Sequence, residues 1–192
     1  ADLDAAIPTI VNAIVQNAGQ TCSAGSRLLV EESIYEPLLE RLGAAFEALR
    51  VGPAAMDLDL GPLIRQSQQQ RVWDFLSDAQ VAGIAMVAQG VVVDEAPESG
   101  FYQAPTLLRD VPVNHRLAQE EVFGPVLSAM SFRDEDHAVQ LANATRFGLV
   151  AGIWTRDGAR QFRMAKRVQS GQVFINNYGA GGGVELPFGG VK

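Results

Sequence analysis

The chain carries one cysteine, Cys22, and its neighbours favour a reactive thiol over a buried one. A structural free cysteine behaves as a small hydrophobe and usually has apolar neighbours. Cys22 lies instead between Thr21 and Ser23, in a stretch with glycines at positions 19 and 25. A thiol in such a polar, tightly turning loop is open to a small molecule, and polar neighbours can stabilise the attacking thiolate. The residues alone leave a catalytic nucleophile and a thiol without chemistry both open.

An acidic pair, Glu120 and Glu121, is the second candidate. It precedes Val122-Phe123-Gly124-Pro125 and a strand-like run. A carboxylate accepts hydrogen bonds from both hydroxyls of a ribose, so the pair could fix the nicotinamide end of a dinucleotide. A solvated acidic turn, with Gly124-Pro125 as an ordinary turn pair, explains the same residues.

Two further features do not predict a site. The glycine cluster at 179–183 follows a strand-like segment, but Val184 replaces the third glycine of a dinucleotide phosphate loop and no periodic helix follows. His115 and His137 have no ligand partners at metal-binding spacing, and we predict no metal site.

Composition limits the class of protein. The 192 residues are 47% hydrophobic and 19% charged, which predicts one globular domain with a substantial core. The net charge of −7 and the lack of a basic run argue against a nucleic-acid partner. No apolar stretch approaches the ~20 residues that span a bilayer, so we expect no membrane partner. One cysteine cannot form an internal disulfide, which suits a reducing, cytoplasmic compartment.

Helical and strand-like segments alternate along the chain. Predicted helices lie at about 4–18, 33–49, 66–81, 134–145 and 157–171, and predicted strands at 26–31, 84–88, 106–108, 126–132, 149–154 and 172–176. Asp134 and Asp157 are predicted N-caps, and Ser33 with Glu36 has the form of a capping box. The alternation predicts an α/β fold with an open, mostly parallel sheet and helices on both faces. Ligands of such sheets bind beyond the carboxyl ends of the strands, where we expect Cys22.

Three segments, in order, resemble signature segments of the aldehyde dehydrogenase superfamily, and together they cover essentially the whole chain. Gly19, Gln20, Cys22, Ala24 and Arg27 match the active-site run Gly-Gln-x-Cys-x-Ala-x-x-Arg. The other two are Glu-Glu-Val-Phe-Gly-Pro-Val at 120–126 and Leu-Pro-Phe-Gly-Gly-Val-Lys at 186–192.

The resemblance implies that Cys22 is the nucleophile of an NAD- or NADP-dependent aldehyde dehydrogenase. Its thiolate would add to the aldehyde, the thiohemiacetal would lose a hydride to the nicotinamide, and the thioester would be hydrolysed to a carboxylic acid. The Cys22 N–H is then a candidate oxyanion donor. The resemblance also implies that Glu121 binds the nicotinamide ribose and that Phe123 packs beside the ribose or nicotinamide.

The same resemblance places Thr21, Ser23, Tyr178 and Glu185 on the substrate side. It implies that residues 1–192 are the catalytic domain, without the nucleotide-binding domain and the C-terminal oligomerisation tail. The general base of the family would precede Asp2, so we expect the isolated chain to be inactive. We expect the parent enzyme to be a homo-oligomer that acts on a small-molecule aldehyde.

Three alternatives remain. The first is a coenzyme-A-acylating aldehyde dehydrogenase, which differs in residues upstream of Ala1. The second is a cysteine hydrolase or acyltransferase that pairs Cys22 with a histidine, although neither histidine lies in such a signature. The third is a non-catalytic fragment that keeps only the fold, against which the presence of Cys22, Glu121 and Phe123 together argues. No arginine lies in the loop 178–187, which disfavours a dicarboxylic semialdehyde as substrate.

Overall fold

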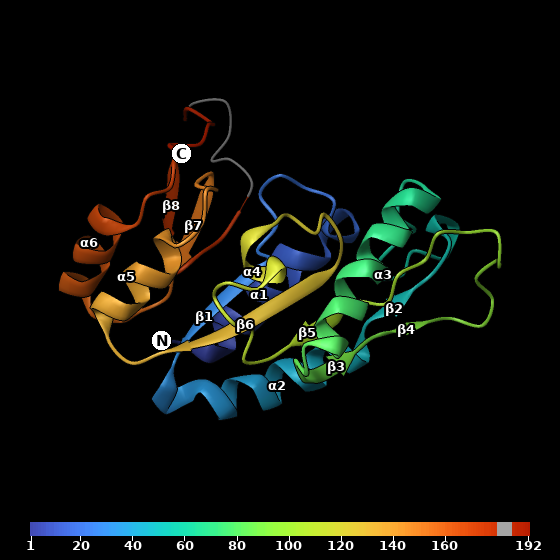
Figure 1. Ribbon diagram of the computed structural model, residues 1–192, viewed down its shortest axis with the longest axis horizontal. Coiled ribbons are helices and arrows are strands. Elements are labelled where there is room, and N and C mark those ends of the chain that lie inside the picture. The colour runs from blue at the N-terminus through green and yellow to red at the C-terminus, as the bar shows by residue number, and fades with distance from the viewer. Residues whose placement is uncertain (180–185) are drawn as a thin grey trace.

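A computed structural model describes residues 1–179 and 186–192 and shows a mixed α/β chain with mostly parallel strands (Figure 1). The main sheet has the order β1-β6-β5-β3, with β1 at Arg27–Glu31, β3 at Met86–Gln89, β5 at Thr106–Leu108 and β6 at Val126–Phe132. Two parallel pairs join β2 (Arg50–Val51) to β4 (Val91–Val92) and β7 (Val150–Ile153) to β8 (Gln172–Ile175). The predicted fold class is confirmed, while β3 pairs with β5 in the antiparallel sense.

Each predicted helix is present, although the first and last end three or four residues early, and the short helix at Arg116–Gln119 was not predicted. The helices are α1 (Leu3–Val15), α2 (Tyr35–Ala48), α3 (Gln66–Val81), α4 (Arg116–Gln119), α5 (Glu135–Asn143) and α6 (Gly158–Arg167), with 3₁₀ segments at Gln16–Gly19, Glu32–Ile34 and Ala54–Met56. Both predicted aspartate caps are confirmed. Asp134 accepts a hydrogen bond from the His137 amide at 2.8 Å, and Asp157 accepts one from the Arg160 amide at 3.0 Å.

The predicted capping box at the start of α2 is wrong. Ser33 lies within the 3₁₀ segment, Ile34 is the N-cap residue, and no side chain caps the helix. Glu36 instead forms an ion pair with the Arg109 guanidinium. The local pattern fails because a charged partner distant in the sequence binds the glutamate.

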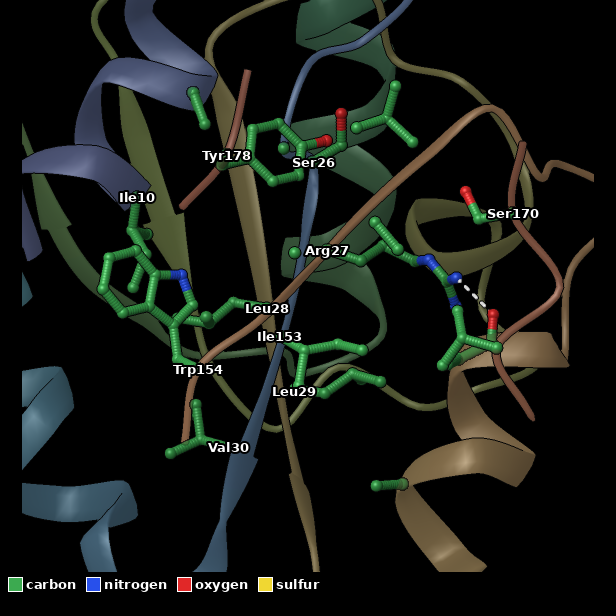
Figure 2. A pocket seen from close by; sticks show the side chains of 18 of the residues that line it. Ile10, Ser26, Arg27, Leu28, Leu29, Val30, Ile153, Trp154, Ser170 and Tyr178 are labelled. Atoms are coloured by element: carbon green, nitrogen blue, oxygen red, sulfur yellow. Dashed lines mark hydrogen bonds between the residues drawn. The ribbon is translucent and has the colours of Figure 1, made fainter. Parts of the chain in front are cut away.

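The strand β1 separates two helices on opposite faces of the main sheet. Successive side chains of a strand point to opposite faces. Leu28 lies on the side of Ile10 of α1, whereas the Arg27 guanidinium donates hydrogen bonds to backbone carbonyls of α5 (Figure 2). In parallel register, Arg27 lies opposite Ser128 of β6.

Burial divides the chain into two parts, which we call the large body (residues 1–132) and the small lobe (residues 135–175). The small lobe, drawn in orange and red in Figure 1, gathers α5, α6, β7 and β8 at one end of the molecule. The core of the large body includes fully buried Ile14, Leu39, Leu42, Phe46, Val72, Phe75, Leu107 and Leu127. The described core cluster of the small lobe consists of Ala138, Val139 and Met164, with partly buried Phe132, Ile153 and Val168 packed against it.

Across residues 1–179 and 186–192, no helix has both the length and the apolar character needed to cross a membrane.

Candidate active site

The loop that carries Cys22 begins with a left-handed turn. In the structure, α1 ends at Val15 and not at residue 18 as predicted. Asn17, Ala18 and Gly19 follow it with φ of 51°, 54° and 72°. This conformation is strained for an alanine and is adopted freely by glycine. The turn reverses the chain so that it runs back beside α1, where the Gly25 amide donates to the Ala13 carbonyl at 2.9 Å.

Hydrogen bonds then fix the loop at both ends and leave the thiol exposed. The Ala24 amide donates to the Thr21 carbonyl at 3.1 Å and closes a turn around Cys22 and Ser23. Gln20 accepts a hydrogen bond from the Ile64 amide through its Oε1 at 2.9 Å. Cys22 is exposed and Ser23 is buried. The expectation of an accessible thiol in a polar loop is confirmed.

The segment that carries Glu121 packs directly against the Cys22 loop. A methyl group at Gly19 would overlap the Gly124 carbonyl and would lie 2.7 Å from the Pro125 nitrogen, so the two loops meet backbone to backbone. Phe123 adopts a left-handed φ of 58°. The Glu121 carboxylate is exposed, and within the part of the chain that the structure describes only its backbone carbonyl is hydrogen-bonded.

A cavity of about 620 Å³ brings several of the predicted residues together. Cys22, Ser23, Glu121 and Tyr178 all line it. Figure 2 shows the part of the cavity that lies between the side chains of β1, Ile153 of β7 and Tyr178. Thr21 and Phe123 are half-buried and are not among its described lining residues. Glu185, predicted on the substrate side, lies outside the described residues. The sequence therefore predicted two adjacent loops and one tyrosine that the structure places on one cavity.

The Tyr178 ring lies between two glycines on opposite sides of this cavity. A Cβ at Gly25 would be 3.7 Å from the ring, and a Cβ at Gly152 of β7 would be 2.8 Å from it. Burial raises the pKa of Tyr178 to about 12, because water no longer solvates the phenolate. The phenol is therefore neutral at ordinary pH and can act as a hydrogen-bond donor but not as a base.

Arg27, the last residue of the motif around Cys22, links β1 to the small lobe. Its guanidinium donates to the carbonyls of Leu141 and Ala142 at 3.1 and 3.0 Å. These groups lie in the last turn of α5, where carbonyls lack helical partners and the helix dipole favours a cation. The contact with α5 therefore gives Arg27 a structural role in the described part of the chain.

The position of the site within the sheet differs from the prediction. Cys22 precedes β1 and Glu121 precedes β6, and these strands are parallel, so both residues lie at the amino ends of the strands. The expectation of a site at the carboxyl edge is wrong. The rule for open α/β sheets rests on loops that follow strands, whereas both of these loops lead into strands.

Neither histidine can serve Cys22 from its observed place. His115 accepts a hydrogen bond from the Leu117 amide through Nδ1 at 3.2 Å, and His137 accepts one from the Arg133 amide at 3.3 Å. Neither lines the cavity. The hydrolase alternative therefore lacks its histidine base. Among the described residues, no three His, Cys, Asp or Glu side chains are grouped closely enough to hold a metal ion.

Sequence reasoning missed two residues that contact the Glu121 segment. Gln68 and Arg71 of α3 donate to its backbone carbonyls. The sequence signal for them was the polar run Gln68-Gln69-Gln70 within a predicted helix. In the structure, Gln68 and Gln69 of this run are half-buried. Polar side chains on the inner face of an amphipathic helix usually bind a partner.

Comparisons with known proteins agree with this geometry. The sequence profile of the aldehyde dehydrogenase family matches residues 1–192. The NADP⁺ succinate-semialdehyde dehydrogenase 1 of Mycobacterium tuberculosis is 42% identical over 193 residues, which cover 100% of this chain and 41% of that protein. A crystal structure from Burkholderia cenocepacia, assigned to the aldehyde dehydrogenases, superposes with a TM-score of 0.98 at 75% identity and covers 100% of this chain and 40% of that one. The NAD⁺ complex of a Bacillus cereus aldehyde dehydrogenase superposes with a TM-score of 0.92 at 32% identity and covers 100% of this chain and 38% of that one. The chain thus spans about two fifths of the length of these relatives.

Proposed function

Because the chain belongs to the aldehyde dehydrogenase family, we propose that residues 1–192 form the cysteine-bearing catalytic domain of an NAD- or NADP-dependent aldehyde dehydrogenase. The observation that carries the proposal is the pairing of an exposed thiol and an exposed carboxylate in one cavity. Cys22 and Glu121 come from loops that pack backbone to backbone, so their separation is set by rigid contacts.

The residues at the site fit a nicotinamide dinucleotide. Glu121 lines the cavity and is exposed, so its carboxylate can accept hydrogen bonds from the two hydroxyls of a ribose. Phe123 lies two residues further on the same segment and supplies an apolar ring for the ribose or nicotinamide. The Bacillus cereus relative is described in complex with NAD⁺, and the Mycobacterium tuberculosis relative carries NADP⁺ in its name. We propose the same pair of dinucleotides for this chain.

The chemistry then follows from the thiol. The Cys22 thiolate adds to the aldehyde carbon, and the carbonyl π electrons move to oxygen to form a thiohemiacetal anion. The backbone N–H of Cys22 is a candidate donor to that oxygen. A bound NAD or NADP supplies the acceptor for the hydride that leaves the thiohemiacetal, and a thioester remains on Cys22. Water adds to the thioester carbonyl carbon, the carbon–sulfur bond breaks, the carboxylic acid departs, Cys22 regains its thiolate, and one proton of the water passes to solvent.

Three side chains are proposed for the substrate side. Thr21 and Ser23 flank the thiol, and both are small, which leaves room for the substrate. Tyr178 closes the cavity from the opposite side and offers a neutral hydroxyl donor. Glu185 remains a prediction from the sequence.

A trapping experiment tests the proposal in a full-length protein that carries this chain. The protein is mixed with an aldehyde and NAD⁺ or NADP⁺, quenched in acid, digested, and analysed by mass spectrometry for an acyl group on the peptide that contains Cys22. We expect the adduct only when both aldehyde and dinucleotide are present. Aldehyde oxidation that persists in Cys22→Ala, without an adduct in the unmodified protein, would contradict the proposal.

A further inference from the structure

We infer that Gln68 and Arg71 of α3 are positioning residues that hold the Glu121–Phe123 segment at the correct place relative to Cys22. This inference rests on the proposed function and adds two residues that the motifs do not contain. It concerns the backbone of the segment, whereas the proposed ribose contact concerns the Glu121 side chain.

Three consecutive carbonyls of this segment accept hydrogen bonds from one helix face. Gln68 Nε2 donates to the carbonyls of Val122 at 3.1 Å and Phe123 at 2.7 Å. Arg71 Nη2 donates to the Glu121 carbonyl at 2.6 Å. Positions 68 and 71 are neighbours on a helix surface, because residues three apart lie on one face. The segment is thus attached to α3 at each of its residues.

The segment needs such support because it has no regular structure of its own. Residues 120–125 belong to neither a helix nor a strand. Phe123 has a left-handed φ of 58°, a conformation that persists in a non-glycine residue only when the surroundings impose it. Its carbonyl accepts the shorter of the two Gln68 bonds, so the donor acts at the strained residue itself.

The same helix is also joined to the Cys22 loop. Ile64, just before α3, donates its amide to Gln20 Oε1 at 2.9 Å. Val72, on the next position after Arg71, leaves only enough room for a glycine at 124, since a Cβ there would lie 2.5 Å from Val72 Cγ2. The first half of α3 and the residue Ile64 just before it therefore contact the two loops, α3 the Glu121 segment and Ile64 the Cys22 loop, and help to place them relative to each other.

Substitution of Gln68 should change the position of the Glu121–Phe123 segment and should not change the reactivity of the Cys22 thiol. Removing the Gln68 amide frees two carbonyls and lets the segment shift. A misplacement of about 1 Å between reacting groups can cost roughly 10²-fold in rate. The adenosine half of a dinucleotide contacts other parts of a full-length enzyme, so overall affinity should change little.

The chain offers a matched control at the adjacent position. Gln69 Nε2 donates to the Tyr102 carbonyl at 2.8 Å, which is the same kind of bond from the same helix to a segment that does not line the cavity. Gln68→Leu removes two such bonds and Gln69→Leu removes one, so both should lower the unfolding temperature, the first somewhat more. Only the first should affect the site.

The test measures single-turnover hydride transfer, equilibrium dinucleotide binding and Cys22 alkylation by iodoacetamide in a full-length protein that carries this chain. For Gln68→Leu we expect hydride transfer to fall roughly 10- to 100-fold, with dinucleotide affinity and alkylation unchanged. Gln69→Leu should transfer hydride at the unmodified rate. Arg71→Met should be slower than Arg71→Lys, because lysine keeps a donor for the Glu121 carbonyl. Equal rates for Gln68→Leu and Gln69→Leu would overturn the inference.

A second readout does not depend on activity. Hydrogen exchange of the amides at 121–124 should be faster in Gln68→Leu than in Gln69→Leu, and equal exchange in the two variants would also overturn the inference. If the unmodified protein shows no aldehyde-dependent hydride transfer, the proposed function fails while this comparison still decides the positioning role.

Discussion

The large body and the small lobe face each other across the cavity and are stabilised differently. The large body has a continuous core with side chains such as Phe46, Phe75 and Leu42 at 0% exposure. The buried large apolar side chains described in the small lobe are fewer, Met164 at 9% and Leu141 at 8% exposure. The helices of this lobe are joined instead by ion pairs at the surface, in which the half-buried Glu135 contacts Arg160 and Arg163 at 2.8 and 2.6 Å.

This difference agrees with the roles that we propose for the two parts. Cys22 and Glu121, whose separation must be kept, both belong to the large body. Tyr178, which follows the last strand of the small lobe, lies on the proposed substrate side. Reacting groups need support from a packed scaffold, whereas substrate contacts tolerate small displacements.

The largest effect should come from the nucleophile. Cys22→Ala removes the covalent route, so hydride transfer in a full-length protein should fall by several orders of magnitude. Dinucleotide binding should survive, because the thiol is not part of the ribose contact. Single-turnover absorbance and a binding titration measure the two quantities. Turnover close to the unmodified rate would show that the reaction does not use the Cys22 thiol.

Core truncation should distinguish the two parts by their stability. Phe75→Ala in the large body removes a fully buried ring and should cost about 3–5 kcal/mol, whereas Met164→Ala in the small lobe should cost about 2 kcal/mol, at the low end for such a change. Denaturant unfolding of the 192-residue chain measures both free energies. A larger loss for Met164→Ala would reverse the comparison.

Polar substitutions on the two sides of the cavity should change different kinetic constants. Glu121→Gln weakens the proposed contact with the ribose, so hydride transfer should slow by roughly 10²-fold with little change in dinucleotide affinity. Tyr178→Phe removes one hydroxyl from the substrate side and should raise KM with kcat nearly kept. If Glu121→Gln transfers hydride at the unmodified rate, the acidic pair is a solvated turn.

The smallest effect should be a loss of order in the small lobe at acidic pH. Hydrogen bonds from Arg163 and then Arg160 lower the pKa of Glu135 from 4.5 to about 2. A lowered pKa stabilises the folded state above pH 4.5, and this contribution is lost as the pH falls from 4.5 toward 2. Glu135 is only half-buried and its arginine partners reach the solvent, so the change should be modest.

The two tryptophans separate the parts in this acid titration. Trp73 lies on α3 in the large body and Trp154 follows β7 in the small lobe. With Trp73→Phe, fluorescence reports on the small lobe and should change between pH 4.5 and 2. Adding Glu135→Gln should remove that change. In the Trp154→Phe protein, Trp73 reports on the large body, and its fluorescence change with pH should be the same with and without Glu135→Gln. If Glu135→Gln altered the fluorescence of both tryptophans equally, the effect of Glu135 would not be confined to the small lobe.

Local patterns in the sequence predicted local structure well. The bounds of α3 and β6 are those of the predicted segments, because the apolar period is long in one and uninterrupted in the other. The caps at Asp134 and Asp157 form as predicted, since a cap bond joins residues three apart. The failed cap at Ser33 shows the limit of such patterns. Glu36 pairs with Arg109, which is 73 residues away.

The sequence predicted candidate residues for the site but not how they come together. Motifs identified Cys22, Glu121 and Tyr178, and the structure places all three on one cavity. The contact of Gly19 with Gly124 and the bonds from Gln68 join segments that are far apart in the chain. Periodicity does not predict such contacts, because they depend on how the loops before β1 and β6 meet each other and the start of α3.

The placement of the Tyr178 ring between Gly25 and Gly152 has a consequence for evolution. A side chain at Gly152 would displace the ring, so the residue acceptable at 152 depends on the residue at 178. Gly25 is limited in the same way by the ring and also by Ala13, whose Cβ would lie 2.9 Å from an added methyl. Lineages that replace the tyrosine with a smaller residue are thereby freed to enlarge β7 at position 152. Substrate preference on this side of the cavity should therefore diverge through paired changes at 152 and 178, and only rarely through either position alone.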